Sequence, residues 1–231
     1  MSALQRAQID HLVVAARTLD EGVAWCEATL GVTPGPGGEH ALFGTHNRLL
    51  RLSCASAPRA YLEIIAINPR ALPTRPAGHA RWFDLDDPSL QHRLDQHGPQ
   101  LVHWVVSVPD IEAAHARLLA LGIQRGPVIG ASRPTPQGLL QWRITVREDG
   151  QRLFDGALPT LIQWGDTHPA ESMPHSGLTL QAFTLSHPEA ARLQQTLAAI
   201  GLEGMAVVPG PAALSAQLDT PQGPRTTASA S

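Results

Sequence analysis

The sequence predicts an α+β fold in which a β-α-β-β-β unit occurs twice. The first observation is a repeated apolar stretch with a histidine at its third position: residues 9–14 return as residues 101–106, 92 positions later. Both stretches are rich in β-branched residues, which is typical of strands, and each leads into a helical pattern. A further observation is that each unit closes with an apolar strand interrupted by one polar side chain, Glu63 or Gln163.

The first unit, residues 7–68, contains clear helix signals after its opening strand. Thr18 and Glu21 form a capping box, and apolar residues then recur on one helical face until Gly31, which can end the helix in a left-handed conformation. Three strand-like segments follow, at about 39–44, 48–53 and 60–67, and turn residues separate them.

Residues 69–100 form a connection rich in Pro, Arg and His, with a possible short helix after Asp87 and Pro88. Such a long connection is expected to be either a lid or disordered. The second unit, residues 101–168, repeats the plan of the first. Asp110 can cap its helix and Gly122 can end it, a weak edge strand follows, and clear strands occupy about 139–146 and 158–164.

A partial β-α-β-β unit is predicted over residues 176–222, with a packing role. Its helix would begin at a capping box of Ser186 and Glu189 and end at Gly201. Residues 223–231 are expected to be a flexible tail.

The composition of the 231-residue chain excludes several classes of function. A net charge of −3 provides no basic field for a nucleic acid, and the absence of lysine excludes a Schiff base or a P-loop. Cys26 and Cys54 are too few for a disulfide scaffold. Because the chain has neither an apolar signal-peptide core nor a membrane-length apolar run, we expect a soluble cytoplasmic protein with no membrane partner. We also expect it to be a monomer or a homodimer and to act on a small-molecule substrate.

Alternation along the strands predicts the candidate site. If the first and last strands of a unit are neighbours, His11 meets Glu63, and the same argument joins His103 to Gln163. Two such sheets facing one cleft would provide ligands for a divalent metal ion. The alternative for each histidine is a hydrogen-bonded core residue. A carboxylate at position 63 is harder to explain without a partner, because burying an unpaired charge is costly.

The chain resembles the vicinal oxygen chelate superfamily, and within it the glyoxalase-like domain proteins. The resemblance rests on five motifs: Ile-Asp-His-Leu-Val-Val at 9–14, Gly-Thr-His-Asn-Arg-Leu-Leu at 44–50, Tyr-Leu-Glu-Ile-Ile at 61–65, Trp-Phe-Asp-Leu-Asp-Asp-Pro at 82–88 and Leu-Ile-Gln-Trp-Gly at 161–165. It implies paired βαβββ modules of the glyoxalase, bleomycin-resistance and dioxygenase type. It also implies one divalent ion (Zn, Ni, Mn or Fe) on His11, Glu63, His103 and Gln163.

The resemblance leaves three functions open. The leading hypothesis is a metal-dependent lyase or isomerase of glyoxalase type, acting on a small carbonyl or enolisable substrate with Glu63 as the base. Gln163 departs from that pattern, since a glyoxalase commonly has a second acid there. The alternatives are a non-haem Fe(II) extradiol-type dioxygenase and a metal-free protein that binds or sequesters a small molecule.

Four further residues are predicted to contact the substrate. In the strand at 139–146, the polar side chains alternate with apolar ones, and we expect the polar set, Gln141 and Arg143, to face the cleft. Arg143 would hold an anion, with simple surface exposure as the alternative. His46 and Asn47, in a turn-like motif, are expected at the mouth of the cleft, whereas Trp164 is expected to face the helices.

Overall fold

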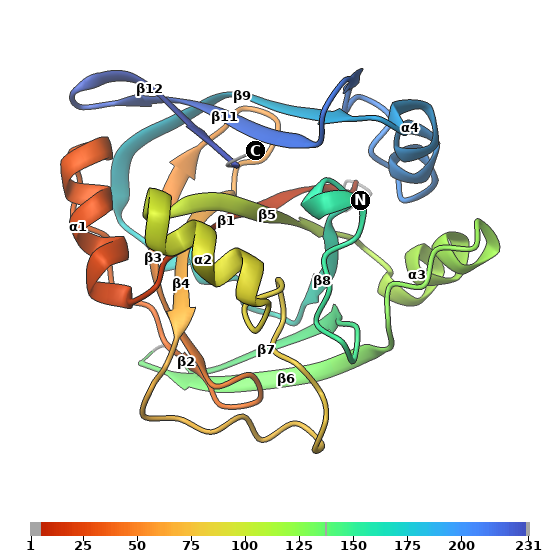
Figure 1. The fold of residues 1–231 in the computed structure, drawn as a ribbon, viewed down its shortest axis with the longest axis horizontal. Coiled ribbons are helices and arrows are strands. Elements are labelled where there is room, and N and C mark those ends of the chain that lie inside the picture. The colour runs from red at the N-terminus through yellow and green to blue at the C-terminus, as the bar shows by residue number, and fades with distance from the viewer. Residues whose placement is uncertain (1–5, 137, 230–231) are drawn as a thin grey trace.

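The computed structural model describes residues 6–136 and 138–229 (Figure 1). Residues 1–5, 230 and 231 lie outside this part of the chain, so the end of the expected tail is not described. The first predicted unit has the order β-α-β-β-β. Its elements are β1 (Gln8–Ala15), α1 (Leu19–Leu30), β2 (Glu39–His40), β3 (Thr45–Ser53) and β4 (Tyr61–Ile67).

The connecting segment contains α2 (Pro88–His97), and the second unit repeats the order of the first. The elements of the second unit are β5 (Gln100–Ser107), α3 (Ile111–Ala120), β6 (Val128–Thr135), β7 (Gly138–Thr145) and β8 (Thr160–Trp164). The third unit comprises β9 (His175–His187), α4 (Ala190–Ala199), β10 (Val207–Pro209), β11 (Ala213–Thr220) and β12 (Gly223–Ala228). The expectation of a flexible tail from residue 223 is therefore wrong for β12, which pairs with β11.

The helix ends follow the sequence signals closely in the first two units. Thr18 accepts a hydrogen bond from the backbone of Glu21, and Gly31 ends α1 with a φ of 70°. Asp110 caps α3 in the same way. The third unit differs, because α4 begins after Glu189 with no side-chain cap, while the Ser186 hydroxyl donates to a carbonyl in the loop before β11.

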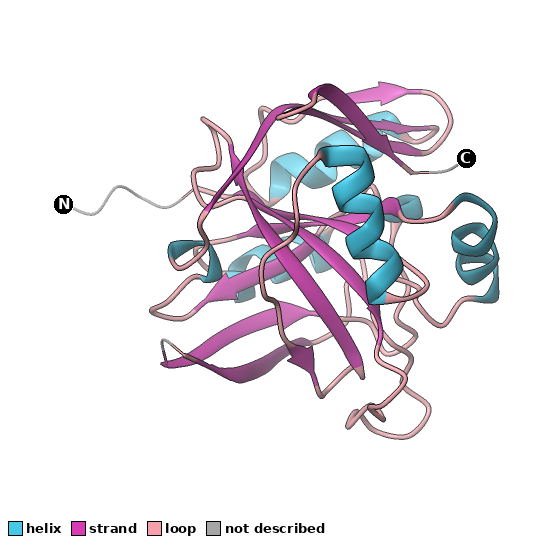
Figure 2. Ribbon diagram, turned by 90° about the vertical axis from the view of Figure 1, so that its left-hand side faces the viewer, coloured by secondary structure: helices cyan, strands magenta, loops and turns pink. Residues whose placement is uncertain are grey.

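All strands belong to one curved sheet, which Figure 2 shows from the side. The order along the sheet is β12-β11-β9-β3-β4-β1-β5-β8-β7-β6, with β2 added to β3 and β10 to β9. The first and second units join where β1 pairs antiparallel with β5. The third unit joins where β9 pairs parallel with β3, so it extends the same sheet.

The two faces of the sheet carry different cores. One face packs against α1, α3 and α4: Cys26 and Leu30 of α1, for example, belong to a buried cluster that includes Leu62 and Ile64 of β4. The other face is concave and holds a second cluster, in which Trp82, Phe83 and the leucines of α2 cover the middle of the sheet. Within the described ranges, no helix combines the length and the apolar character needed to cross a membrane.

Candidate active site

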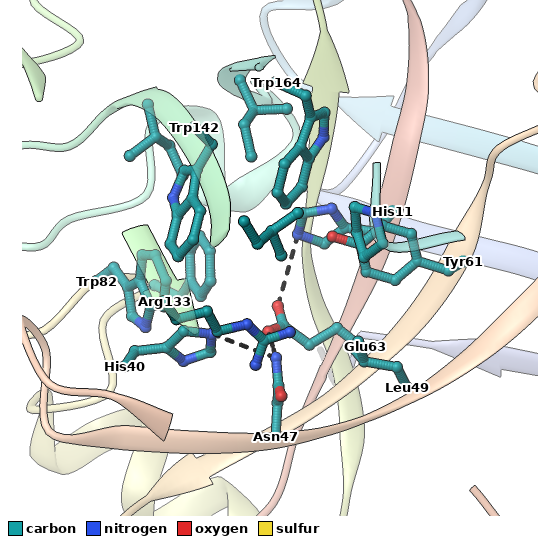
Figure 3. A pocket seen from close by; sticks show the side chains of 15 residues that line it. His11, His40, Asn47, Leu49, Tyr61, Glu63, Trp82, Arg133, Trp142 and Trp164 are labelled. Atoms are coloured by element: carbon teal, nitrogen blue, oxygen red, sulfur yellow. Dashed lines mark hydrogen bonds and ion pairs between the residues drawn. The ribbon is translucent and has the colours of Figure 1, made fainter. Parts of the chain in front are cut away.

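His11 and Glu63 meet on the concave face, as strand alternation predicted. Strands β1 and β4 are parallel neighbours, and their register places His11 opposite Tyr61 and Val13 opposite Glu63. The His11 Nε2 lies 3.5 Å from the Glu63 Oε2, and both side chains are buried (Figure 3). The Tyr61 ring stacks on the imidazole with 4.5 Å between the ring centroids, which fixes the plane of the His11 ring.

Asp10 holds the other nitrogen of His11. Its Oδ1 accepts a hydrogen bond from His11 Nδ1 at 2.7 Å, and its Oδ2 accepts from Trp164 Nε1 at 2.8 Å and from His168 Nε2 at 3.1 Å. Burial by itself would raise the pKa of the Asp10 carboxyl, but the hydrogen bonds and the charges of His11 and His168 outweigh it, so the pKa lies well below the usual range. Asp10 is therefore an anion that keeps the His11 proton on Nδ1 and turns Nε2 toward Glu63.

Asn47 fixes the other oxygen of Glu63. The Asn47 amide nitrogen donates to Glu63 Oε1 at 2.6 Å and lies 3.3 Å from His40 Nε2, while its oxygen accepts from the backbone of Gly38 at 2.8 Å. Burial lowers the pKa of His40 to about 3, so its ring is neutral and its Nε2 can accept. These hydrogen bonds orient the carboxylate of Glu63. Asn47 also lines the cavity in front of Glu63, and its contact with the substrate stays a prediction.

A small chamber lies in front of these groups, with a cavity volume of about 30 Å³. Such a volume has room for about two water molecules, so only the reacting end of a ligand fits inside. Apart from Arg133, its remaining walls are apolar and aromatic: Leu49, Trp82, Phe83, Leu140, Trp142, Ile144, Ile162, Trp164 and Pro169. A proton held in such surroundings is shielded from bulk water.

A larger groove of about 800 Å³ adjoins the chamber, and Leu49, Arg133, Leu140 and Pro169 line both. Of these four shared residues, Arg133, on β6, is the cationic one, whereas Arg51 lines the groove alone. Its Nη1 is buried and makes no hydrogen bond with the described part of the chain. Gly38 makes room for this guanidinium, because a Cβ there would lie 1.6 Å from Nη1.

His103 does not join His11 and Glu63. Its Nδ1 donates to the carbonyl of Gly156 at 3.1 Å, and its Nε2 accepts from the Thr160 hydroxyl at 3.0 Å. Burial lowers the pKa of His103 well below its usual value, and the nearby Arg125 guanidinium lowers it further, so the ring is neutral with both nitrogens occupied. This is the hydrogen-bonded core histidine that the sequence left open as an alternative.

The connecting segment forms a wall between His103 and the chamber. Trp82 and Phe83 line the chamber on one side and the cavity beside His103 on the other, and the Phe83 ring lies 5.1 Å from that of His103. Phe83 and Asp84 both adopt positive φ angles, 60° and 58°, which are strained for side chains of this kind. The segment expected to be a lid or disordered thus contributes a buried wall.

The prediction that Gln163 faces the cleft is wrong. Ile162 and Trp164 line the chamber, so the residue between them points toward the helices. There the Gln163 side chain accepts from the backbone of Ile111 at 3.1 Å and donates to the carbonyl of Pro109 at 3.1 Å, which fastens the start of α3 to β8. Trp164 accordingly faces the chamber, contrary to expectation.

The predicted substrate contacts on β7 and at the start of β3 are also placed elsewhere. Leu140, Trp142 and Ile144 line the chamber, so Gln141 and Arg143 point away from it, and Arg143 pairs with Glu112 on α3. His46 precedes Asn47 and lies on the opposite face of β3. On β7 the apolar set of the strand faces the chamber, so the polar set points away; on β3 the set that contains Asn47 and Leu49 faces it, so His46 points away.

The donor set does not fit the metal site predicted from the sequence. A structural or catalytic metal site uses three or four protein ligands. Here His11 and Glu63 lie together, while His103 and Gln163 are engaged elsewhere, and the described residues contain no cluster of three or more His, Cys, Asp or Glu side chains arranged to hold an ion. The expected site on His11, Glu63, His103 and Gln163 is therefore not assembled.

Sequence reasoning missed several residues of the site. Asp10 directly precedes His11, which is a predicted site residue. Its role was missed because two of its hydrogen-bond partners, Trp164 and His168, are far away in the sequence. His40 lies in a two-residue strand and His168 in a loop, where alternation gives no direction. Arg133 lies on β6, which the sequence indicates only as a weak edge strand. The motif at 82–88 is one of the five that carry the family resemblance, but no pattern in it indicates that Trp82 and Phe83 pack against the concave face of the sheet.

Comparison with known proteins agrees with this architecture. A search of curated proteins finds no match. Among solved structures, a hypothetical protein from Staphylococcus aureus matches with a TM-score of 0.56 and 14% identity, covering 96% of this chain and 85% of that one, which supports the fold alone. Two methylmalonyl-CoA epimerases match more distantly. The Mycobacterium tuberculosis protein has a TM-score of 0.40 and 17% identity, covering 74% of this chain and 97% of that one. A variant of the Streptomyces coelicolor protein in complex with 2-nitronate-propionyl-CoA has a TM-score of 0.39 and 20% identity, covering 69% of this chain and 94% of that one.

The sequence itself matches the family model described as Glyoxalase-like domain over residues 9–201. This range includes both β-α-β-β-β units, the connecting segment and the third unit as far as the end of α4. It confirms the resemblance inferred from the five motifs and the predicted α+β class. The chain therefore belongs to the glyoxalase-like domain family.

Proposed function

We propose that this protein is an isomerase or lyase that moves a proton on a small enolisable carbonyl compound, with Glu63 as the base. The observation that carries the proposal is the state of the Glu63 carboxylate. Asn47 fixes its Oε1, while its Oε2 faces His11 Nε2 at 3.5 Å inside an apolar chamber. A carboxylate with one anchored and one available oxygen is suited to take a proton from a bound substrate.

The pair of His11 and Glu63 supports this role because it is arranged to hold one proton. Asp10 keeps a proton on His11 Nδ1, so Nε2 and Glu63 Oε2 would face each other as two acceptors unless a proton lies between them. An imidazolium beside a carboxylate, and an imidazole beside a carboxylic acid, both meet this requirement. The proposed reaction uses the first arrangement, with the Asp10 carboxylate on the far side of the imidazole.

In the proposed reaction, Glu63 Oε2 takes the proton from the carbon next to the substrate carbonyl. The C–H electron pair moves into the enolate, whose negative charge resides on the carbonyl oxygen. His11, protonated on Nε2, donates a hydrogen bond or its proton to that oxygen. Return of the proton from Glu63 to the neighbouring carbon, with His11 taking back any proton that it gave to the oxygen, completes an isomerisation and restores both groups. Return to the same carbon from the same side gives hydrogen exchange alone.

The chamber and groove support a substrate with an anionic group. Arg133 lies where the chamber meets the groove, and its buried Nη1 has no partner in the described chain, so a carboxylate or another anion can accept from it. The chamber admits only a few atoms, whereas the groove has room for the body of a larger molecule. We therefore expect an anionic carbonyl compound whose enolisable end enters the chamber.

The geometry gives less support to the alternatives that depend on a metal. A facial triad for iron would need His103 beside His11 and Glu63, and its two hydrogen bonds hold it behind Phe83. A binding protein without chemistry is the second candidate. In its favour, the rings of Trp82, Trp142 and Trp164 line the chamber, as a site for an apolar or aromatic ligand requires.

Hydrogen exchange from substrate carbon into D₂O tests the proposal directly. Protein treated with a chelator would be incubated with a panel of 2-oxo acids and other carboxylates that bear an acidic C–H, and NMR would follow the loss of the C–H signal. We expect exchange for at least one compound, and a fall of about 10²–10⁴-fold in Glu63→Gln, the range typical of losing a general base. Glu203→Gln, at an exposed site, is the matched control.

Three outcomes separate the hypotheses. Exchange that survives in Glu63→Gln would contradict the role of Glu63 as the base. Exchange that occurs only after a divalent metal is added would favour the metal-dependent hypothesis. Compounds that quench tryptophan fluorescence by binding in the chamber, with no exchange, would favour the binding protein.

A further inference from the structure

A second cavity, of about 10 Å³, lies beside His103 and shares only Trp82 and Phe83 with the chamber. Three arginines line it, Arg125, Arg147 and Arg152, and no carboxylate side chain does so. This lining differs from that of the chamber, where Glu63 is the charged group beside His11. The cavity is not part of the proposed proton-transfer site.

Two of the three guanidinium groups have carboxylate partners outside the cavity. Arg147 donates to Asp149, with 2.8 Å between Nε and Oδ1, and Arg152 donates to Asp84, with 2.8 Å between Nε and Oδ2. Each of these pairs is electrically neutral. The lining therefore has one positive charge left over, that of Arg125.

Arg125 is 2% exposed and has no carboxylate hydrogen-bond partner within the described chain. Its Nη2 donates to the Thr160 hydroxyl, and its Nε makes no hydrogen bond. The carboxylate of Asp84 acts on Arg125 from a distance, but it already accepts from the side chain and the backbone of Arg152. Burying a guanidinium without a counter-ion has a large cost in folding free energy. An anion beside Arg125 would offset that cost.

We propose that this cavity binds one small anion, chloride, as the counter-ion of Arg125. Burial lowers the pKa of Arg125 to about 9, so the group is charged at neutral pH. Thr145 adds a donor, because its oxygen already accepts from the backbone of Leu161 and its hydroxyl proton is available. The cavity has about the volume of one water molecule, which excludes sulfate, phosphate and carboxylates. Chloride is slightly larger than water, so its entry in place of a water molecule requires a small outward shift of the lining side chains.

Thermal unfolding in chloride and in gluconate at equal ionic strength tests this site. Gluconate is too large for the cavity, so a chloride-specific rise in Tm reports binding to the folded state. Above the dissociation constant, we expect Tm to rise by about 3 °C for each tenfold increase in chloride. Arg125→Met should abolish the difference between the two salts. Arg117→Met, which removes an exposed arginine from α3, should preserve it.

Anomalous diffraction from crystals grown in bromide provides a measurement that needs no variant. The proposal predicts a bromide peak within hydrogen-bonding distance of the Arg125 guanidinium. A water molecule at that place, or equal Tm values in chloride and gluconate for the unmodified protein, would overturn it. Neither result depends on the proton-transfer activity, so failure of one proposal leaves the other unaffected.

Discussion

Asp10→Asn should destabilise the protein by about 2–3 kcal/mol at neutral pH. The three hydrogen bonds to Asp10, from His11, Trp164 and His168, are charge-assisted in the native protein. Asparagine keeps only one acceptor oxygen. Two bonds to that oxygen would fall from about 1.5–3 to about 0.5–1.5 kcal/mol each, and the bond at the other position would be lost because an amide nitrogen donates. The three losses sum to about 4–5 kcal/mol, and relief from burying a charge returns part of that sum.

The pH dependence of this difference follows from the direction of the pKa shift. The pKa of Asp10 lies below its ordinary value of 3.8 in the folded protein, so its charge stabilises the fold at any pH above 3.8. Stability from this group is lost as the pH falls through the folded-state pKa. The difference between the native protein and Asp10→Asn should be constant from about pH 8 to 5. Below pH 3.8 it should shrink by up to about 1.4 kcal/mol per pH unit.

Urea unfolding followed by tryptophan fluorescence at pH 7, 5 and 3 measures both quantities. Asp166→Asn, at an exposed position, is the matched control and should change stability by no more than about 0.5 kcal/mol. The reasoning would be refuted if Asp10→Asn matched the control at pH 7. It would equally be refuted if the difference persisted unchanged at pH 3.

Two further predictions concern the groove and the cysteines. Gly38→Ala places a Cβ where the Arg133 guanidinium lies. It should raise the KM for an anionic substrate in the D₂O exchange assay by about 10–100-fold, as expected for a lost charged hydrogen bond. Gly130→Ala, in open space on β6, should leave KM unchanged. Burial raises the pKa of the Cys26 thiol to about 12, so a disulfide reagent at pH 8 should label one thiol per native chain, at Cys54, and two in denaturant. A rapid second equivalent in the native protein would contradict the burial of Cys26.

The sequence predicted the first half of the site because several independent signals agree there. The capping box at Thr18, the glycine at position 31 and the alternation around His11 and Glu63 all specify the same β-α-β-β-β unit. In that unit the strands that carry the two polar groups are direct neighbours. Parity then suffices to bring His11 and Glu63 together, and their interaction is confirmed at 3.5 Å.

The second half could not be predicted in the same way, because β8 is buried on both faces. Leu161 packs toward the helices while Ile162 packs toward the chamber, so alternation does not show which side Gln163 takes. The hydrogen-bond partner of His103 on β8 is Thr160, which lies three residues before Gln163. Only the pairing of β5 with β8 in the structure reveals this contact. Arg125 gave no signal, since a lone arginine in a loop is usually solvated, and its burial depends on contacts distant in sequence.

The aromatic wall of Trp82 and Phe83 has a mechanical consequence for the two hollows that it separates. Neither hollow can widen on its side of the wall without crowding the other, since a ligand that pushes the rings away from His11 pushes them toward His103. Asp84, the next residue, is tied to Arg152 in the second unit, while the Trp82 ring stacks on Phe43 of the first unit, so the wall is held from both units. Occupants of the two hollows therefore compete for the same few ångströms of space.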